Sequence, residues 1–272
     1  GTWIKDYSRY GNHGTMTNMD PDTDWVDGRM DKALDFDGDN DYVDAGSTIF
    51  NNATAIAKGT ISFWVKLNST NLYDFMWAKG AYYAAISHNG SGIMKVYSDP
   101  QGAYFSTATI SIDGSNWNHV SVAWNATGSD LYIDGALDTS NAITFAQMAS
   151  AGYAGNNEFG GLDGIAGYAI DGSIDDVRIY NRALSSSEVE SLANGNAYTG
   201  SGVYTLGSAL DVNGDLKMYT GGIREPGLGN GVTISGSWLN YGGQFTAGTG
   251  TITFDGSASQ ASQNTIYENI GF

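Results

Sequence analysis

The chain contains no cysteine, so disulfides, thiolate metal sites and cysteine nucleophiles are excluded. Basic residues are scarce: 12 Lys and Arg stand against 29 Asp and Glu, which gives a formal net charge of −17. This charge repels phosphate backbones and anionic membrane surfaces, which disfavours nucleic acid as a partner. No apolar run approaches the roughly 20 residues that span a bilayer, so membrane insertion is not expected. Residues 1–5 lack the charged and apolar regions of a signal peptide.

Aromatic residues and glycine are plentiful. Aromatics make up 12% of the 272 residues and there are 38 Gly, so the composition favours a packed core over disorder. Apolar residues alternate in short runs bounded by Gly, Asn and Asp, which predicts strands at 60–67, 119–124 and 130–133. The last run closes in Asp134 and Gly135, a type I′ hairpin signal. Many short strands predict an all-β sandwich or jelly roll.

The pattern of the chain changes near residue 197. Before that point, residues 185–193 predict one short helix, which Ser185 and Glu188 begin as a capping box. After it, a linker rich in Gly and Ser at 199–202 leads into short strands with Gly-rich corners. Two of these strand units echo one another, which predicts a small β domain built as a β-solenoid or a small sandwich. The expected domains are therefore residues 1–197 and residues 198–272.

Six motifs of the first domain occur in a specific order. They read DYSRYGNHG at 6–14, ALDFDGDNDYV at 33–43, ISFWV at 61–65, WNHV at 117–120, LYIDG at 131–135 and IDDVRIYNRALS at 174–185. In this order they resemble the laminin-G-like domains of the concanavalin A-like lectin/glucanase superfamily. The resemblance covers residues 1–197 and implies a two-sheet antiparallel jelly roll with one short helix. Such domains are typically secreted, often bear calcium, and are often appended to enzymes or adhesins.

The start and the tail of the chain add two expectations. Members of the family usually begin one strand earlier, whereas this chain starts directly at the turn that follows that strand. A sheet without that strand would expose an unpaired edge, which is a site for pairing with another chain. The tail units resemble repeats that follow such domains in large prokaryotic surface proteins.

Carboxylates are densest where residues 35–44 are expected to form a strand and turn. Asp37, Asp39 and Asp41 fall on one face of an extended segment, where their repulsion calls for a cation or for separation. The resemblance implies a calcium ion that joins this loop to the acidic residue opening the last strand, Asp175. We therefore expect a structural Ca²⁺ bound among Asp37, Asp39, Asp41 and Asp175. The alternative is that these are solvated turn carboxylates that cap their own backbone.

Sugar-binding sites use aromatic faces beside amide and carboxylate groups. The aromatic candidates lie in the middle strands: Trp77, Tyr82, Tyr83, Tyr97 and Tyr104. The alternative is that such residues are core or edge residues of a β-sandwich. The loop at 155–163 loosely resembles the ligand-presenting calcium loop of pentraxins, which makes Asn157 a further candidate. An ordinary hairpin loop rich in Gly and Asn is the simpler interpretation.

Catalysis finds little support in the sequence. A retaining glycosidase needs two carboxylates about 5 Å apart. The glucanases of the resembled superfamily carry them as a Glu-x-Asp-x-x-Glu strand, a pattern that the five Glu of this chain do not form. No Ser/His/Asp arrangement and no phosphate-binding Gly-rich loop is evident either, so the protein is not expected to be an enzyme. N-glycosylation sequons stand at Asn52, Asn68, Asn89 and Asn125.

Two functions follow from these features. The first is a non-catalytic glycan-binding or adhesion module of an extracellular cell-surface protein, whose partners are glycans; it rests on the fold resemblance. The second is a structural subunit of an extracellular filament, sheath or virion surface, in which neighbouring copies of the chain exchange strands. The missing first strand and the strand-rich tail motivate this alternative.

Overall fold

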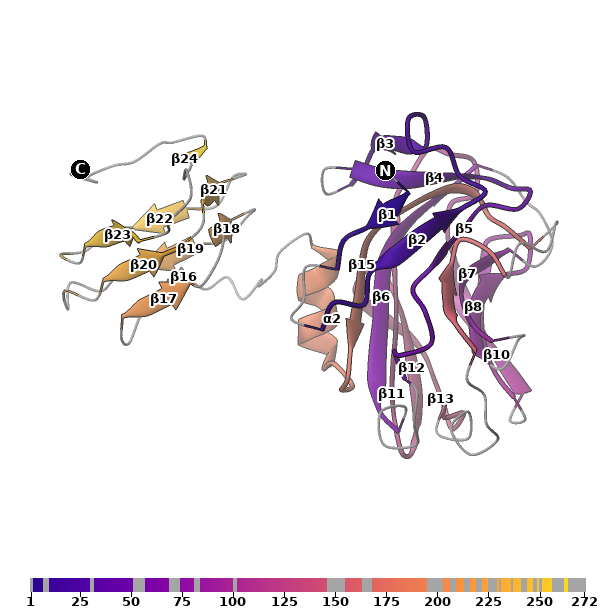
Figure 1. The fold of residues 1–272 in the computed structure, drawn as a ribbon. Coiled ribbons are helices and arrows are strands. Elements are labelled where there is room, and N and C mark those ends of the chain that lie inside the picture. Colours follow the sequence, from indigo (N-terminus) through magenta and orange to yellow (C-terminus); the bar gives the residue numbers. More distant parts are fainter. Residues whose placement is uncertain are drawn as a thin grey trace. The chain divides into compact units, whose positions relative to one another are not determined.

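A computed structural model of the chain shows two units, residues 1–189 and residues 190–272 (Figure 1). The structure describes residues 2–6, 10–29, 32–50, 57–68, 74–80, 84–99, 102–145, 155–162 and 168–194, and in the tail 203–205, 209–212, 216–218, 222–224, 229, 231–235, 237–240, 244–246, 249, 251–255 and 262–263. The first unit is the predicted jelly roll of two antiparallel sheets. The division between the units falls within a helix, eight residues before the predicted boundary at 197. The predicted linker at 199–202 lies outside the described residues.

The larger sheet, sheet A, has eight strands. Its order across the sheet is β1 (Trp3–Ile4), β2 (Gly14–Thr17), β5 (Tyr42–Asp44), β14 (Asn157–Phe159), β7 (Phe75–Lys79), β8 (Ala84–His88), β9 (Ile93–Ser98) and β10 (Gly102–Thr109). The pair β1 and β2 corrects one expectation. The chain does not start directly at the turn, because a two-residue strand precedes it and pairs with β2 at the edge of sheet A.

The second sheet, sheet B, has seven strands. Its order is β13 (Ala136–Asn141), β12 (Gly128–Ile133), β11 (Asn118–Asn125), β6 (Gly59–Leu67), β15 (Asp171–Tyr180), β4 (Lys32–Asp37) and β3 (Trp25–Asp27). Three of these strands, β6, β11 and β12, were predicted from the alternation of apolar residues. The central strand β6 is hydrogen-bonded to β11 on one side and to β15 on the other.

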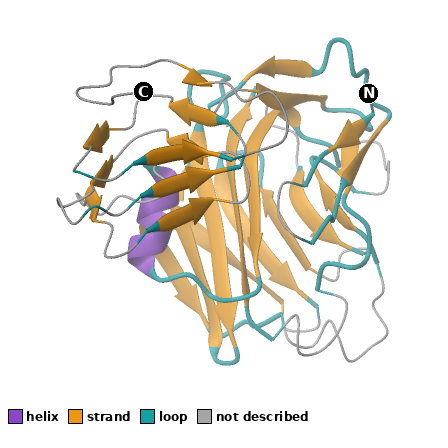
Figure 2. Cartoon of the chain, turned by 60° about the vertical axis from the view of Figure 1, so that its left-hand side comes forward, coloured by secondary structure: helices purple, strands orange, loops and turns teal. Residues whose placement is uncertain are grey.

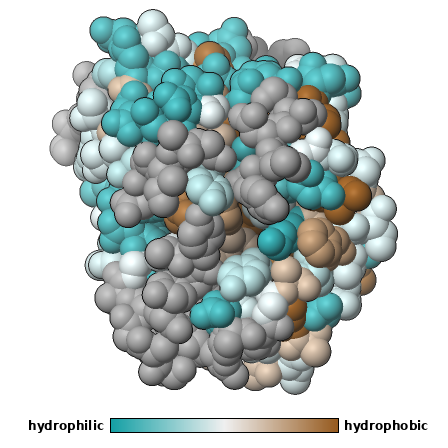
Figure 3. All heavy atoms as spheres, turned by 90° about the vertical axis from the view of Figure 1, so that its right-hand side faces the viewer, coloured by the Kyte–Doolittle hydropathy of each residue, from teal (hydrophilic) through white to brown (hydrophobic). Residues whose placement is uncertain are grey.

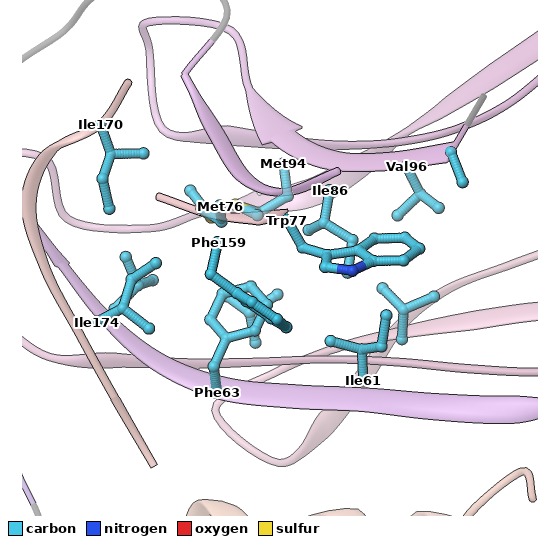
Figure 4. Close-up of a cluster of buried hydrophobic side chains, with 14 of the residues drawn as sticks. Ile61, Phe63, Met76, Trp77, Ile86, Met94, Val96, Phe159, Ile170 and Ile174 are labelled. Atoms are coloured by element: carbon cyan, nitrogen blue, oxygen red, sulfur yellow. The ribbon is translucent and has the colours of Figure 1, made fainter. Parts of the chain in front are cut away.

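The core of the jelly roll lies between the two sheets. Figure 4 shows apolar side chains of both sheets meeting there. The fully buried members include Ile61 and Phe63 of β6, Met76 and Trp77 of β7, and Ile86 of β8. Burying one such side chain stabilises the fold by about 1.5–3 kcal/mol, so this layer supplies much of the driving force for folding. Alternate residues of sheet A point to its other face, called here the outer face of sheet A.

Two local predictions are confirmed by backbone geometry. Asp134 and Gly135 both have positive φ, 50° and 81°, as a type I′ turn requires. At the helix α2 (Ser186–Ala193), the backbone N–H of Ser185 donates to Glu188 Oε2 over 2.9 Å, and Ser185 Oγ accepts from the N–H of Glu188 over 3.4 Å. This is the reciprocal capping box expected from the sequence.

The helix α2 contacts sheet B, and it is the one α-helix in the described part of the chain (Figure 2). Ser186 Oγ lies 3.3 Å from the Tyr132 hydroxyl of β12. With eight residues, α2 falls well short of the ~20 that cross a bilayer. Within the described ranges, no helix has the length and hydropathy of a membrane span.

The tail pairs its strands in parallel. Its three sheets are β16 (Val203–Thr205) with β19 (Gly222–Arg224) and β22 (Gln244–Thr246); β17 (Leu210–Val212) with β20 (Val232–Ile234) and β23 (Ile252–Phe254); and β18 (Leu216–Met218) with β21 (Trp238–Asn240) and β24 (Ser262–Gln263). Each circuit of the chain adds one strand to each sheet, which is the winding of a β-solenoid. Val232, Ile234 and Trp238 are buried inside it.

Candidate functional site

The outer face of sheet A carries an aromatic surface on the edge strand β10 and its neighbour β9. Lys95 and Tyr97 of β9 point to this face, because they alternate along the strand with Met94 and Val96, which point into the core. Phe105 of β10 is paired in register with Lys95 and is 50% exposed. Figure 3 views this side of the molecule and shows separate hydrophobic residues among hydrophilic ones.

Tyr97 is the centre of this surface. Its ring packs on an apolar cluster of the outer face, as does Tyr168; the buried members of the cluster are Phe75, Ala78, Ala85 and Leu162. The ammonium of Lys95 lies 5.6 Å from the centre of the Tyr97 ring. The Tyr97 hydroxyl donates to Asp99 Oδ1 over 3.5 Å, and burial together with the Asp99 charge raises the pKa of Tyr97. Lys95, Tyr97, Phe105 and Tyr168 are called the Tyr97 patch below.

From Tyr97, residues paired in register form one continuous row across all eight strands of sheet A, called the register row below. Its members on successive strands are Trp3, Thr15, Asp44, Glu158, Ala78, Ala85, Tyr97 and Ala103. Two adjacent carboxylates stand in the middle of the row. Asp44 Oδ1 accepts from the Gly46 N–H over 2.7 Å, and its Oδ2 accepts from Asn156 Nδ2 over 2.9 Å. Both oxygens of Asp44 are therefore engaged, one by the segment after β5 and the other by the segment before β14.

Two predicted ligand-binding residues are buried, and those predictions are wrong. Trp77 is fully buried, and its ring points between the sheets beside Ile61 and Ile86 (Figure 4). Asn157 is fully buried too, and its Nδ2 donates to the carbonyls of Gly46 and Ile49 over 3.0 and 3.1 Å. Neither side chain can contact a ligand at the surface.

The other aromatic candidates have different positions. Tyr104 is 6% exposed and belongs to the core, where burial raises the pKa of its hydroxyl well above the ordinary value. Tyr82 and Tyr83 lie outside the described residues. Tyr97 is thus the predicted candidate that the structure places on the outer face of sheet A.

A buried lysine beside Asn157 was missed by sequence reasoning. Lys79 is 1% exposed, and its ammonium donates to the carbonyls of Ile49 and Gly155, each over 3.0 Å. Burial lowers the pKa of Lys79 from 10.5 to about 8. Lys79 and Asn157 together tie the segment after β5 to the segment before β14.

The predicted calcium ligands do not all converge. Asp37 Oδ1 accepts from the Asp39 N–H over 2.9 Å, and Asp41 Oδ2 accepts from the Asp37 N–H over 3.1 Å. Burial is the main cause that raises the pKa of Asp41 to about 6, and the charges of Asp37, Asp24 and Asp39 add to it. These carboxylates are close neighbours.

Asp175 lies elsewhere, so its assignment to the same site as Asp37 is wrong. Asp171 is the residue of β15 that pairs with Asp37, whereas Asp175 pairs with Trp64 of β6. Asp175 Oδ1 accepts from the backbone N–H of Asp176 over 2.6 Å. Across the described ranges, no group of three or more His, Asp and Glu residues is arranged to hold a metal ion.

A serine and a histidine meet on the far side of sheet B. Ser62 Oγ of β6 and His119 Nε2 of β11 lie 2.8 Å apart, and each residue is 1% exposed. Burial and the charge of Arg178 lower the pKa of His119 to about 4, so its ring is neutral at pH 7. His119 Nδ1 has no hydrogen-bond partner among the described residues. A nucleophilic triad needs an orienting carboxylate there and an accessible serine, and this pair has neither.

The predicted glycosylation sites differ in exposure. Asn68 and Asn125 are exposed, and Asn89 is half-buried. Asn125 Oδ1 accepts from the backbone N–H and the hydroxyl of Thr127, over 2.8 and 2.7 Å. Asn52 lies outside the described residues.

Comparisons with known proteins extend these observations. A sequence profile described as "Concanavalin A-like lectin/glucanases superfamily" matches residues 37–190. No curated protein matches the sequence. Among solved structures, domain 4 of AbnA, an extracellular arabinanase of Geobacillus stearothermophilus in complex with arabinotriose, is 22% identical with a TM-score of 0.50, covering 66% of this chain and 87% of that one.

Two sialidase structures are similar as well. Trypanosoma rangeli sialidase in complex with the inhibitor DANA is 15% identical with a TM-score of 0.51; the match covers 66% of this chain but only 29% of the sialidase. A carbohydrate-binding module of Ruminococcus gnavus IT-sialidase, bound to α2,3 sialyllactose, is 18% identical with a TM-score of 0.48, covering 59% of this chain and 96% of that one. At these identities the likeness establishes the fold alone.

Proposed function

Because the chain belongs to the concanavalin A-like lectin/glucanases superfamily, we propose that its jelly roll is a non-catalytic glycan-binding module. The observation that carries this proposal is the Tyr97 patch. Aromatic side chains half-exposed beside carboxylates are the surface on which sugar rings stack while their hydroxyls find hydrogen-bond acceptors. Tyr97 supplies the ring, and Asp99 at its hydroxyl supplies an acceptor.

The comparisons support the class of ligand. Domain 4 of the arabinanase was solved with arabinotriose, so a jelly roll of similar fold in another protein binds a neutral oligosaccharide. The sialidases also act on sugars, although the matched part is a minor share of their length. Fold likeness alone does not transfer a function, which is why the proposal depends on the Tyr97 patch.

Binding is favoured over catalysis because the candidate catalytic side chains are buried or already hydrogen-bonded within the protein. Both carboxylate oxygens of Asp44 accept hydrogen bonds, one from the Gly46 N–H and one from the Asn156 side chain, and Glu158 beside it is 6% exposed. Ser62 and His119 are buried on the other sheet. We propose that the module holds its ligand for an extracellular surface protein and acts in adhesion. Glycans presented by another cell are then its partners.

We propose a structural calcium ion only for the loop that contains Asp37, Asp39 and Asp41. Because these three side chains are not by themselves arranged to hold a metal ion, other oxygen ligands such as backbone carbonyls would have to complete the site. Burial is the main cause that raises the pKa of Asp41, and the charges of Asp37, Asp24 and Asp39 add to it; a hard divalent cation would relieve this repulsion between carboxylates. Asp175 does not fit this site, since the strand register places it opposite Trp64. The alternative is that these carboxylates bind no ion and only accept hydrogen bonds from the backbone of their own turn, as Asp37 and Asp41 do.

A glycan array tests the proposal directly. The purified chain should bind a restricted set of oligosaccharides, and Tyr97→Ala should weaken that binding at least about tenfold, the equivalent of about 1.4 kcal/mol. Trp25→Ala is the matched control, because Trp25 is an exposed aromatic residue (37%) of β3 in sheet B. The absence of any glycan bound by the wild-type chain, with or without calcium, would overturn the proposal.

The second candidate is a structural subunit that assembles with neighbouring copies. Within the described part of the tail, β22, β23 and β24 are each hydrogen-bonded to one neighbour, as are β16, β17 and β18. Edges of parallel strands can accept a further strand. Mass measurement and electron microscopy of the purified chain decide this: regular polymers support assembly, and a stable monomer at high concentration excludes it.

A further inference from the structure

The charged side chains around the Tyr97 patch restrict the class of oligosaccharide that it can bind. Resting on the proposed glycan-binding function, we infer that this patch takes an uncharged oligosaccharide and discriminates against sugars that carry a carboxylate or sulfate. The inference depends on which charged side chains reach the outer face of sheet A near Tyr97, and on how each of them is engaged.

Basic residues are nearly absent from this part of the molecule. Among the described residues of β7, β8, β9, β10 and β14, Lys79 and Lys95 are the basic ones, and Lys79 is buried against backbone carbonyls. The neighbouring segments 81–83, 100–101 and 163–167, which lie outside the described residues, contain no Lys or Arg in the sequence. Lys95 is therefore the one cation of the patch.

Other basic side chains of the jelly roll are engaged away from the patch. Some are ion-paired and some stack on aromatic rings of sheet B: Lys32 with Asp27, Arg178 with Asp176, Arg182 with Glu188, Arg29 over Trp64 and Lys66 over Trp117. Strong recognition of a sugar carboxylate or sulfate uses the two-pronged hydrogen bonds of arginine. No described arginine of the jelly roll lies on the outer face near Tyr97.

The charges that do lie on this face are negative. Asp99 contacts the Tyr97 hydroxyl over 3.5 Å. Glu158 and Asp44 stand three and four strands from Tyr97 in the same register row, which at a spacing of about 4.8 Å per strand is about 14 and 19 Å. An anionic sugar at Tyr97 would be repelled mainly by Asp99, because Glu158 and Asp44 lie beyond the Debye length of about 8–10 Å and are largely screened by salt. At low salt the net charge of −17 adds to this repulsion. Sugar hydroxyls, in contrast, are donors that a carboxylate accepts.

Lys95 itself is poorly placed to offset this repulsion. Its ammonium lies over the Tyr97 ring at 5.6 Å from the centroid, where the ring already attracts it. It is also a single point charge that lacks the fixed two-donor fork of an arginine. We therefore assign Lys95 a packing role that holds the Tyr97 ring in place, rather than a role as a binding cation.

The test compares matched pairs of oligosaccharides, each a neutral sugar and the same sugar carrying one sialic or uronic acid. By isothermal titration, the neutral member should bind, and its acidic partner should bind at least about threefold more weakly. Affinity for the neutral member should change less than about twofold between low and high NaCl, because no ion pair forms. Lys95→Met should weaken the affinity for the neutral oligosaccharide less than about threefold, whereas Tyr97→Ala should weaken it at least about tenfold.

The outcomes separate the inference from the function on which it rests. If the acidic member binds tenfold more tightly and loses this advantage in Lys95→Met and at high salt, the inference is wrong while glycan binding stands. If neither member of any pair binds the wild-type chain, the proposed function itself fails. If Trp25→Ala weakens binding as much as Tyr97→Ala, the site is not the Tyr97 patch, and the charge argument fails with it.

Discussion

The buried lysine of sheet A gives a stability prediction with an unusual sign. Lys79 has a pKa of about 8 in the folded chain against 10.5 ordinarily, because the residue is 1% exposed and burial disfavours its charged form; its ammonium donates to the carbonyls of Ile49 and Gly155. Between these two pH values the unfolded chain binds a proton that the folded chain has released. Raising the pH through this window therefore stabilises the fold.

The magnitude follows from the two pKa values. A difference of about 2.5 units corresponds to about 3.4 kcal/mol in total, of which about 2 kcal/mol should appear between about pH 7.5 and pH 9.5. Other groups titrate in this range, so the assay compares the wild type with Lys79→Met. The hydrogen bonds lost in that variant give an offset that does not depend on pH, whereas the stabilisation with rising pH belongs to Lys79 alone.

Urea unfolding followed by tryptophan fluorescence measures the effect. Six of the seven tryptophans lie in the jelly roll, so the signal reports mainly on that unit. The wild type should gain about 2 kcal/mol relative to Lys79→Met between about pH 7.5 and pH 9.5. Parallel pH profiles of the two proteins would refute the reasoning, because Lys79 would then have an ordinary pKa.

Three further predictions concern single sites. His119 has a pKa of about 4 in the folded chain against 6.5 ordinarily, so the free energy of unfolding should fall by up to about 3.4 kcal/mol as the pH drops from 6.5 to 4. In urea titrations, His119→Gln should remove this part of the decrease in stability at acidic pH. Asp41, whose pKa is raised to about 6, destabilises the fold when it is ionised, so Asp41→Asn should raise the Tm at neutral pH in calcium-free buffer. Millimolar calcium should raise the Tm of the wild type and leave that of the variant unchanged. A lower Tm for the variant than for the wild type in calcium-free buffer would contradict this prediction. Gly160→Ala should cost more than about 2 kcal/mol in urea titrations, because its Cβ would clash with the Phe36 ring at a φ of 84°. The control Gly46→Ala, with φ of 71° and open space, should cost only about 1 kcal/mol; equal losses would contradict the clash.

Much of the fold could be predicted because local signals and tertiary structure agree. The alternation at 60–67 became β6, and the Asp134–Gly135 signal became a turn with two positive φ angles. The capping box of Ser185 and Glu188 formed as its spacing predicts. Each of these features is decided within a few residues. The parallel pairing of the tail joins strands about 20 residues apart, so the sequence left a solenoid and a sandwich open.

The candidate site was less predictable because strand phase decides which face a residue occupies. Simple alternation would put Phe75 and Trp77 on one face. In β7 the register shifts between them, so Phe75 joins the outer cluster while Met76 and Trp77 both point into the core. No local pattern in the sequence marks that irregularity. Tyr97 lies on a regular strand, and its alternation with Val96 held.

Long-range partners explain the remaining errors. The sequence around Lys79 gives no sign that it is buried, because the carbonyls that accept its hydrogen bonds belong to residues 30 and 76 positions away. Asp175 was expected near Asp37, yet it stands four positions after Asp171, the residue of β15 that pairs with Asp37. Both outcomes depend on strand register, which a single sequence does not specify.

Residue-by-residue mapping of a bound sugar tests the central claim most directly. An isotope-labelled sample of the chain would be titrated with the oligosaccharide that binds best on the array, and backbone amide shifts would be followed by NMR. The largest saturable shifts are predicted in β8, β9 and β10 around Lys95, Tyr97 and Phe105. Shifts that gather instead on β6 and β11 of sheet B, or no saturable shift with any sugar, would contradict the account.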